Sequence, residues 1–336
     1  MEANEFAYAG GGGRPVRIRG IAYAYAAEQR SVRELAARGE LESEPAVLER
    51  FGFAHVHVAV AESPYELART AACTVLADEG VDPASIGLLV YGGTPSAMAF
   101  AAATDAVAGA ASLCTADRFR YPATRLQHEL GLEGAAVLAL DQLACTTLFG
   151  AVRVARAMMA AEGIERVLCV ASEFYPARAG REAVYNCTSD AACALLLDAS
   201  DDADGRNRIV GDATISKGYY WDPEAMREEV VASYFPTAVH AIGCALRSAG
   251  WRPEDVDWVI PHNVSMRSWD VLLRLVRLPN AKLWGHNIAR RGHTLAGDNF
   301  INLRDAIVEG DLRPGQRALL FAYGYGAHWT ALAVEA

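Results

Sequence analysis

Apolar residues recur at helical spacing in two long stretches of the chain, and a short continuous apolar run follows each of them. The first stretch has its apolar positions at Leu148, Val152, Val154, Ala155, Met158 and Met159 and ends at Glu162-Gly163. The second has them at Phe300, Ile301, Leu303 and Ile307 and ends at Glu309-Gly310. Each pattern predicts an amphipathic helix stopped by a glycine, and the runs Val167–Ala171 and Ala318–Ala322 predict buried strands after them.

Two further segments, 170 positions apart, resemble each other. Residues 76–90 and 246–260 both read as a helix end, a glycine, a proline-containing loop and a buried strand. Such punctuation recurs in many α/β proteins, but several identities at one offset favour a duplicated β/α unit and two similar halves packed together. We expect a flexible tail over 1–15, with its Gly10–Gly13 run, an N-terminal half over 16–205 and a C-terminal half over 206–336.

The first candidate for chemistry is Cys145, at the entry to the first helical stretch. Counted back from the two Glu-Gly pairs, Cys145 and His293 fall within one residue of the same position in each half. Sites in α/β sheets lie at such strand-to-helix turns. A helix N-terminus favours the reactive thiolate, and its free N–H groups can help to form an oxyanion hole. A lone cysteine is usually a small buried hydrophobe, and its place at this turn favours a nucleophile instead.

Two histidines are the other candidates. His262 directly follows the predicted strand ending at Ile260-Pro261, where a histidine is either a capped surface residue or a catalytic one. His293 lies in the sequence Arg290-Arg-Gly-His-Thr near the entry to the second helical stretch. The remaining histidines have less distinctive settings, and we interpret them as structural.

Composition and charge exclude several classes of protein. The chain has 336 residues, 52% of them hydrophobic and 21% charged, and a net charge of −10, which argues against nucleic acid as a partner. No apolar run approaches the roughly 18–20 residues that a membrane span needs. Seven scattered cysteines without a C-x-x-C pair or zinc spacing predict reduced thiols, and therefore a cytoplasmic protein.

Four motifs in order carry a resemblance to a known family. The segments 140–150, around Cys145, and 258–263, ending in Pro-His-Asn, resemble the nucleophile loop and the Pro-His strand of β-ketoacyl-ACP synthase III, in the thiolase superfamily. The segments 188–197 and 321–329 are similar to its Gly-Asp-Gly strand and its Gly-rich C-terminal strand. The likeness runs from about Val16 to the end. It implies an α/β thiolase fold, with duplicated βαβαβαββ halves in five αβαβα layers, and a homodimer.

The resemblance also implies roles for individual residues. Cys145 would attack an acyl thioester of CoA or of an acyl carrier protein, and the N–H groups of Cys145 and Gly324 would form the oxyanion hole. Tyr121 would help to close the acyl pocket across the dimer. Arg267 and Arg274, seven residues apart on a predicted helix from Met266 to Leu278 that also carries Arg277, would bind the acidic carrier protein, although a solvated charged face has the same spacing. No metal or redox cofactor is expected.

One position departs from the family. The third catalytic residue of synthase III is an Asn in a His-Gly-Asn motif, and the corresponding stretch here is Arg291-Gly292-His293. A Cys-His-His set is similar to that of elongating ketosynthases, in which both imidazoles hydrogen-bond the thioester carbonyl that becomes an enolate. Some relatives that pass the acyl group to a hydroxyl or amine carry an acidic residue instead, which makes Asp298 an alternative third residue.

The leading hypothesis is therefore an acyltransferase that performs decarboxylative Claisen condensation with a malonyl thioester, in fatty-acid-like or polyketide metabolism. The alternative is an O- or N-acyltransferase on the same scaffold. A non-catalytic ketosynthase partner subunit is disfavoured because Cys145, His262 and His293 are all retained. A thiolase is disfavoured because it needs a second cysteine near the C-terminus and none follows Cys244. The acyl chain, the donor, the acceptor and the pathway stay open.

Overall fold

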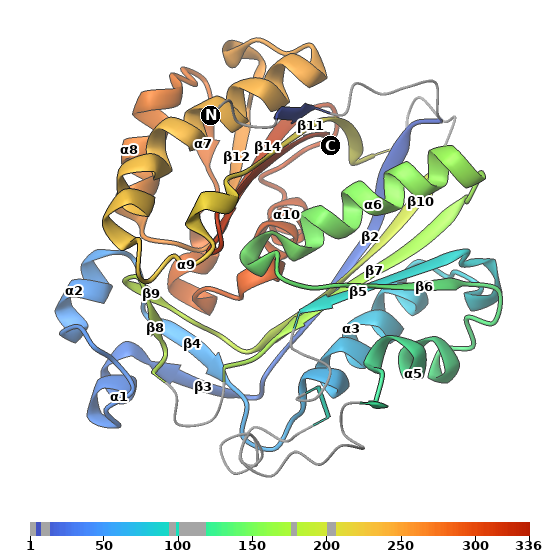
Figure 1. The fold of residues 1–336 in the computed structure, drawn as a ribbon, viewed down its shortest axis with the longest axis horizontal. Coiled ribbons are helices and arrows are strands. Elements are labelled where there is room, and N and C mark those ends of the chain that lie inside the picture. The colour runs from blue at the N-terminus through green and yellow to red at the C-terminus, as the bar shows by residue number, and fades with distance from the viewer. Residues whose placement is uncertain (1–4, 8–13, 94–98, 101–118, 176–179, 200–205) are drawn as a thin grey trace.

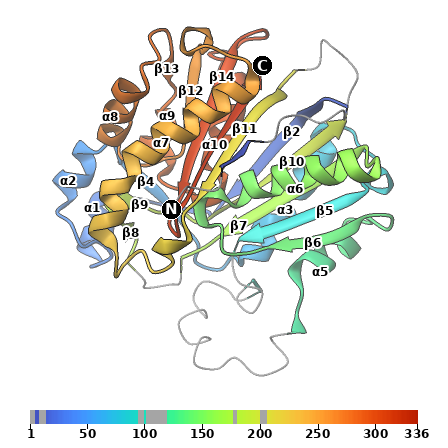
Figure 2. The ribbon, with the colours of Figure 1, turned by 45° about the horizontal axis from the view of Figure 1, so that its top comes forward.

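The centre of the molecule is a sheet of 11 strands, seen across its width in Figure 2. The computed structural model describes residues 5–7, 14–93, 99–100, 119–175, 180–199 and 206–336. The strand order is β13-β12-β14-β15-β11-β2-β10-β7-β5-β6, with β1 paired to β11. The strands are β1 Glu5–Ala7, β2 Val16–Tyr25, β5 Leu88–Gly93, β6 Ala136–Leu140, β7 Arg166–Glu173, β10 Ala191–Ala199, β11 Arg208–Ser216, β12 Trp258–Pro261, β13 Lys282–Leu283, β14 Arg317–Gly324 and β15 His328–Glu335. Two small sheets pair β3 (Glu28–Ser31) with β4 (His55–Val58) and β8 (Glu182–Ala183) with β9 (Asn186–Cys187).

The sheet is built twice from one plan. In the N-terminal half β5 runs parallel to β6 and β7, and β10 runs antiparallel to β7 and β2. In the C-terminal half β12 runs parallel to β13 and β14, and β15 runs antiparallel to β14 and β11. The halves join edge to edge where β2 meets β11, at Arg17 and Arg208. The duplication expected from the repeated segments is therefore confirmed.

The helices divide into three layers (Figure 1). Helices α6 (Thr147–Glu162) and α10 (Asp298–Val308) lie between the halves, α3 (Pro64–Asp78) and α5 (Pro122–Glu129) cover one outer face, and α7 (Arg227–Ala249) and α8 (Met266–Val276) cover the other. Three separate hydrophobic cores correspond to these layers. The predicted five-layered αβαβα arrangement is confirmed. The other α-helices of the described residues are short: α1 (Val32–Ala37), α2 (Pro45–Arg50) and α9 (His286–Arg291).

Local sequence explains where the main helices begin and end. Ser63 caps α3, and Glu66 completes a capping box with it. The predicted stops are also found: Gly163 follows α6 with φ 70° and Gly250 follows α7 with φ 67°, the left-handed conformation that glycine adopts at least cost. After each of these glycines the chain leaves the helix and returns to the sheet, in β7 after α6 and in β12 after α7.

Three observations depart from the expectations. Residues Glu5–Ala7 of the predicted tail form β1 on β11. Helix α8 ends at Val276, so Arg277 lies beyond it, with φ 58°, and not on the helix that carries Arg267. Among the described residues, α7 is long and apolar enough by length and composition to cross a membrane, but it packs on β11 and β15 as a core helix, with 44% of its apolar window buried.

Candidate active site

Cys145 lies on a sharp turn between β6 and α6. The turn is the 3-10 helix η4 (Ala144–Thr146), and Ala144, at φ 46°, adopts a left-handed conformation that costs a non-glycine residue free energy. A matching 3-10 helix, η7 (Leu295–Gly297), precedes α10, and Leu295 has φ 55°. The two turns pack against each other. The nucleophile candidate therefore lies where the halves meet.

Cys145, His293 and Asp298 form one chain of contacts. The Sγ atom of Cys145 lies 3.3 Å from Nε2 of His293, and Nδ1 of His293 lies 2.5 Å from Oδ2 of Asp298. All three are buried, with exposed fractions of 6%, 4% and 0%. Since a carboxylate only accepts hydrogen bonds, Nδ1 carries a proton. In the neutral ring Nε2 is then an acceptor and can take up the proton of the Cys145 thiol.

The electrostatics favour a charged histidine next to Cys145. Burial alone would lower the pKa of His293, but the charges of Asp298 and Cys145, with a hydrogen bond to each, hold that pKa well above its ordinary value. Burial alone would raise the pKa of Asp298, and its interactions with His293, Thr294 and the Asn263 backbone instead keep that pKa low. Asp298 therefore remains a carboxylate beneath His293, and it stabilises the charged ring that forms when the thiol proton moves to Nε2.

His262 is the second imidazole of the site and has a different character. It follows β12 directly, is 2% exposed, and its ring centroid lies 6.1 Å from that of His293. Burial, with the neighbouring charge of His293, lowers the pKa of His262 to about 3, although Asp298 and the Phe321 backbone oppose the shift. His262 is consequently neutral at physiological pH. Its loop is held by Trp269, whose indole N–H donates to the His262 carbonyl at 3.0 Å.

Buried amides support the same loop from below. Asn263 donates its backbone N–H to Asp298 at 2.6 Å and its side-chain amide to the carbonyl of Gly292 at 2.8 Å. Asn302 donates to the Pro261 carbonyl and to the side chain of Asn263, each at 2.8 Å. The loops that carry His262, His293 and Asp298 are thus tied together, which preorganises the site.

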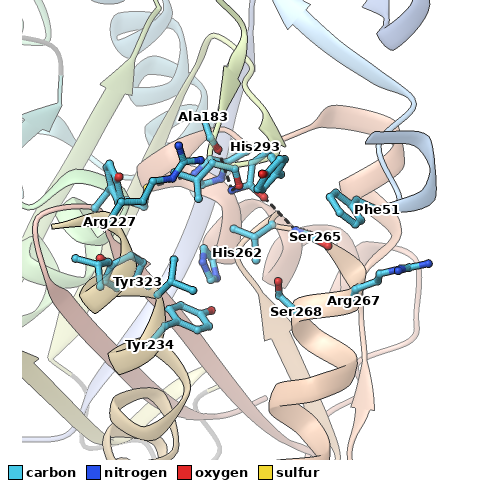
Figure 3. Close-up of a pocket in the computed structure, with 18 of the residues that line it drawn as sticks. Phe51, Ala183, Arg227, Tyr234, His262, Ser265, Arg267, Ser268, His293 and Tyr323 are labelled. Atoms are coloured by element: carbon cyan, nitrogen blue, oxygen red, sulfur yellow. Dashed lines mark hydrogen bonds between the residues drawn. The ribbon is translucent and has the colours of Figure 1, made fainter. Parts of the chain in front are cut away.

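Cys145, His262 and His293 open into one cavity of about 720 Å³. Figure 3 shows His262, Tyr234 and Tyr323 together in its wall, with Phe51 and Arg267 at another side. The lining is largely apolar and aromatic, as is usual for sites that bind small organic molecules. Its residues are Phe51, Cys145, Tyr175, Ala183, Val184, Tyr185, Asn186, Arg227, Glu228, Val230, Val231, Tyr234, Phe235, His262, Val264, Ser265, Arg267, Ser268, His293, Leu295, Tyr323 and Tyr325.

The other predicted site residues lie in different places. Gly324 touches the Cys145 turn, since a Cβ added to it would lie 2.5 Å from the Leu143 carbonyl oxygen. Arg267 lines the pocket from α8, whereas Arg274 is exposed on the same helix and outside the lining. Tyr121 is 57% exposed at the start of α5 and does not line the pocket of this chain.

The predicted equivalence of Cys145 and His293 is wrong. Measured from the helix starts, Cys145 at the centre of η4 corresponds to Ala296 at the centre of η7. The count from the helix ends failed because α6 has 16 residues and α10 has 11. His293 lies three residues earlier than Ala296, in the loop that leads into the second turn.

Several pocket residues were not foreseen. Tyr175, Tyr234 and Tyr323 come from three distant segments, and nothing in their local patterns marks them. Glu173, at the end of β7, was not foreseen either, although it does not line the pocket; burial raises its pKa to about 8 against the opposing charge of His293, and Asp141 adds to the shift. A carboxylate that ends an otherwise apolar strand was a signal that could have identified Glu173.

Comparisons with known proteins agree with this architecture. Residues 246–336 match the family described as 3-oxoacyl-[acyl-carrier-protein] synthase III C terminal. The chain is 30% identical over 236 residues to β-ketoacyl-[acyl-carrier-protein] synthase III 2 of Streptomyces coelicolor, covering 66% of this chain and 70% of that protein. Two solved structures are similar in fold. Synthase III from Aquifex aeolicus has a TM-score of 0.78 at 20% identity, covering 96% of this chain and 100% of that one. The acyltransferase ChlB3 has a TM-score of 0.79 at 18% identity, covering 96% and 97%.

Proposed function

The chain belongs to the β-ketoacyl-[acyl-carrier-protein] synthase III family of acyltransferases, and we propose that it passes an acyl group from a thioester, through Cys145, to the hydroxyl or amine of an acceptor. The observation that carries this proposal is the continuous contact from Cys145 through His293 to Asp298. A carboxylate that holds an imidazole against a nucleophile is the arrangement that acyl transfer needs.

In the first half-reaction the sulfur of Cys145 attacks the carbonyl carbon of the donor thioester. The thiol proton moves to Nε2 of His293, and a new C–S bond forms at Cys145. We assign stabilisation of the oxyanion to the N–H groups of Cys145 and Gly324, and the close approach of Gly324 to the Cys145 turn supports this assignment. The donor C–S bond then breaks, and His293 returns the proton to the leaving thiolate. The donor is an acyl thioester of CoA or of an acyl carrier protein.

The second half-reaction depends on His293 being neutral again. Its Nε2 atom lies 3.3 Å from Sγ of Cys145, so the neutral ring can accept the proton of an O–H or N–H group that attacks the acyl-enzyme. The acceptor atom bonds to the acyl carbon, the bond to Cys145 breaks, and the sulfur regains the proton through His293. Asp298, with four hydrogen bonds and no exposed surface, keeps the ring oriented through both steps.

Decarboxylative condensation is the second candidate, and His262 favours it. The neutral ring of His262 and the charged ring of His293 share the pocket. Each could donate a hydrogen bond to the enolate oxygen of a malonyl thioester. The carboxylate of the malonyl group would leave as CO2, and the resulting carbon would attack the acyl carbon on Cys145. Neither route requires a metal or a redox cofactor.

The accompanying proposals concern partners. We place the enzyme in the cytoplasm as a homodimer, with Tyr121 helping to close the acyl pocket across the dimer. Arg267 and Arg274 are exposed on one helix, and Arg267 also lines the pocket, which supports a role in binding an acidic carrier protein.

One experiment separates the two routes. A short acyl-CoA is expected to add one acyl mass to the wild type and none to Cys145→Ala, and labelling of the variant would refute the nucleophile. The acyl-enzyme is then offered malonyl carrier protein in one reaction and mixed alcohols and amines in another. Transfer without CO2 release supports the proposal. CO2 release with a β-ketoacyl product, without transfer to alcohols or amines, overturns it in favour of condensation.

A further inference from the structure

The hydroxyl of Tyr323 is a buried group in the pocket wall that lacks a hydrogen-bond partner among the described residues. Tyr323 is the residue before Gly324, which touches the Cys145 turn. Tyr323 and Cys145 line the same cavity. The hydroxyl therefore belongs to the reaction chamber.

The ring of Tyr323 is held by its neighbours. Tyr234 meets it edge-on with ring centroids 5.4 Å apart, and Trp329 packs on it at 4.8 Å. Figure 3 shows Tyr234 and Tyr323 in the same part of the wall as His262. Because the ring is fixed on two sides, the position of the hydroxyl is set before any ligand arrives.

A buried hydroxyl without a partner destabilises the folded protein, and a phenylalanine would fill the same space. Burial raises the pKa of Tyr323, so the phenol keeps its proton and can donate at neutral pH. This donor lies in the wall of the cavity that holds Cys145 and has no partner among the described residues, and a ligand that accepts a hydrogen bond from it explains both facts.

The surrounding wall indicates what kind of ligand this is. Tyr175, Tyr185 and Phe51 line the same cavity, and Phe51 and Tyr185 meet edge-on at 6.1 Å. Aromatic side chains make their best contacts with planar apolar bodies. The cavity of about 720 Å³ has room for such a body in front of Cys145.

We propose that Tyr323 is a specificity-determining residue that donates a hydrogen bond to an aromatic acceptor, a phenol or aryl amine that carries a second, hydrogen-bond-accepting oxygen. This inference rests on the proposed transfer to a hydroxyl or amine and names the class of acceptor. The phenol oxygen bonds to the acyl carbon, the C–S bond to Cys145 breaks, and the phenol proton passes through His293 to the sulfur.

The test compares two acceptors of equal shape in single-turnover transfer from the acetylated enzyme. The first is 3-hydroxyacetophenone, and the second is 3-isopropylphenol, in which a methyl group replaces the accepting oxygen. The wild type is expected to prefer the ketone by roughly 5- to 10-fold in kcat/KM, the discrimination that one uncharged hydrogen bond provides. Tyr323→Phe should reduce this preference to nearly 1.

A matched control is Tyr25→Phe. Tyr25 also has a buried hydroxyl without a partner among the described residues, but it packs on His57 and Arg291 and does not line the pocket. This variant should keep the wild-type preference. Thermal unfolding of Tyr323→Phe should be no lower than that of the wild type, because an unmet buried group has been removed.

Three outcomes overturn the inference. An unchanged preference in Tyr323→Phe means that the hydroxyl does not donate a hydrogen bond to the acceptor. Slower acetylation of Tyr323→Phe by acetyl-CoA, with the preference kept, means that the hydroxyl binds the donor. Transfer by the wild type to aliphatic alcohols or amines but to neither phenol removes the aromatic class and leaves the proposed function intact. Failure of the proposed function differs from all three, because the acetylated enzyme then transfers to no alcohol or amine.

Discussion

Replacing Asp298 by Asn keeps the size of the side chain and removes its charge. Oδ2 of Asp298 accepts from Nδ1 of His293 and from the N–H of Asn263, and Oδ1 accepts from the N–H and hydroxyl of Thr294. All four neighbours are donors, so an amide can satisfy only those that face its oxygen. If the NH2 group faces His293, the ring must carry its proton on Nε2 and can no longer accept the proton of Cys145.

His262 provides the scale for the energetic effect. Its pKa of about 3, against an ordinary 6.5, shows what this environment does to an imidazole without a bonded carboxylate. At about 1.36 kcal/mol for each pKa unit, the environment costs the His262 imidazolium about 5 kcal/mol. At His293 the interactions with Asp298 and Cys145 reverse such a cost. Removing the charge of Asp298 should therefore lower the acylation rate by about 10²- to 10⁴-fold, the range that general-base catalysis covers.

Rapid-quench acylation by acyl-CoA, followed by intact-protein mass, measures this rate, and alkylation of Cys145 by iodoacetamide should slow in parallel. Asp305→Asn is the matched control, because Asp305 lies on the same helix and accepts from Tyr23 and Asn287 rather than from His293. Acylation within two-fold of the wild type in Asp298→Asn would refute the reasoning. Equal losses in both variants would assign the effect to packing of α10.

Three smaller predictions follow. Gly324→Ala places a Cβ 2.5 Å from the Leu143 carbonyl oxygen, so it should cost about 1–3 kcal/mol in a urea titration and slow acylation; unchanged values would show that the turn yields freely. The folded pKa of His262 is lowered, so unfolding takes up a proton below pH 6.5, and the wild type should lose about 2 kcal/mol more than His262→Gln between pH 6.5 and 5; parallel urea curves would contradict this. The folded pKa of Glu173 is raised to about 8, so its stabilising contribution is lost as pH rises through 8. The stability of Glu173→Gln relative to the wild type should therefore increase as the pH rises from 5 to 9. A difference in melting temperature that stays constant over this range would contradict the prediction.

The fold was largely predictable because the signals that determine it are local. Gly163 and Gly250 end their helices where the apolar periodicity stops, and β5 and β12 follow their proline-containing loops as the repeated segments predict. Residues Glu5–Ala7 were not predicted because their pairing with β11 is a long-range contact, and three residues are too few to show a periodicity.

The site was predictable only in part, for the same physical reason. Cys145 and His262 follow strands, and a strand end can be found in the sequence. Tyr234 enters the pocket from α7 and Tyr323 from β14, so their meeting depends on how the two elements pack. The position of Asp298 beneath His293 depends on a turn of only a few residues, whose backbone conformation no periodicity specifies.

The duplication explains why the site is where it is. Two turns of the same form, each with a left-handed residue at its start, meet between the halves and bring the N-termini of α6 and α10 together. Cys145 lies at the first of these termini and Asp298 at the second, where the positive end of each helix favours a negative charge. The ring of His293 lies between the two groups and contacts both of them. A copied structural unit has thus given two helix ends that favour anions, and in the proposed mechanism a single histidine in the loop before the second turn moves a proton between the nucleophile and the acyl acceptor.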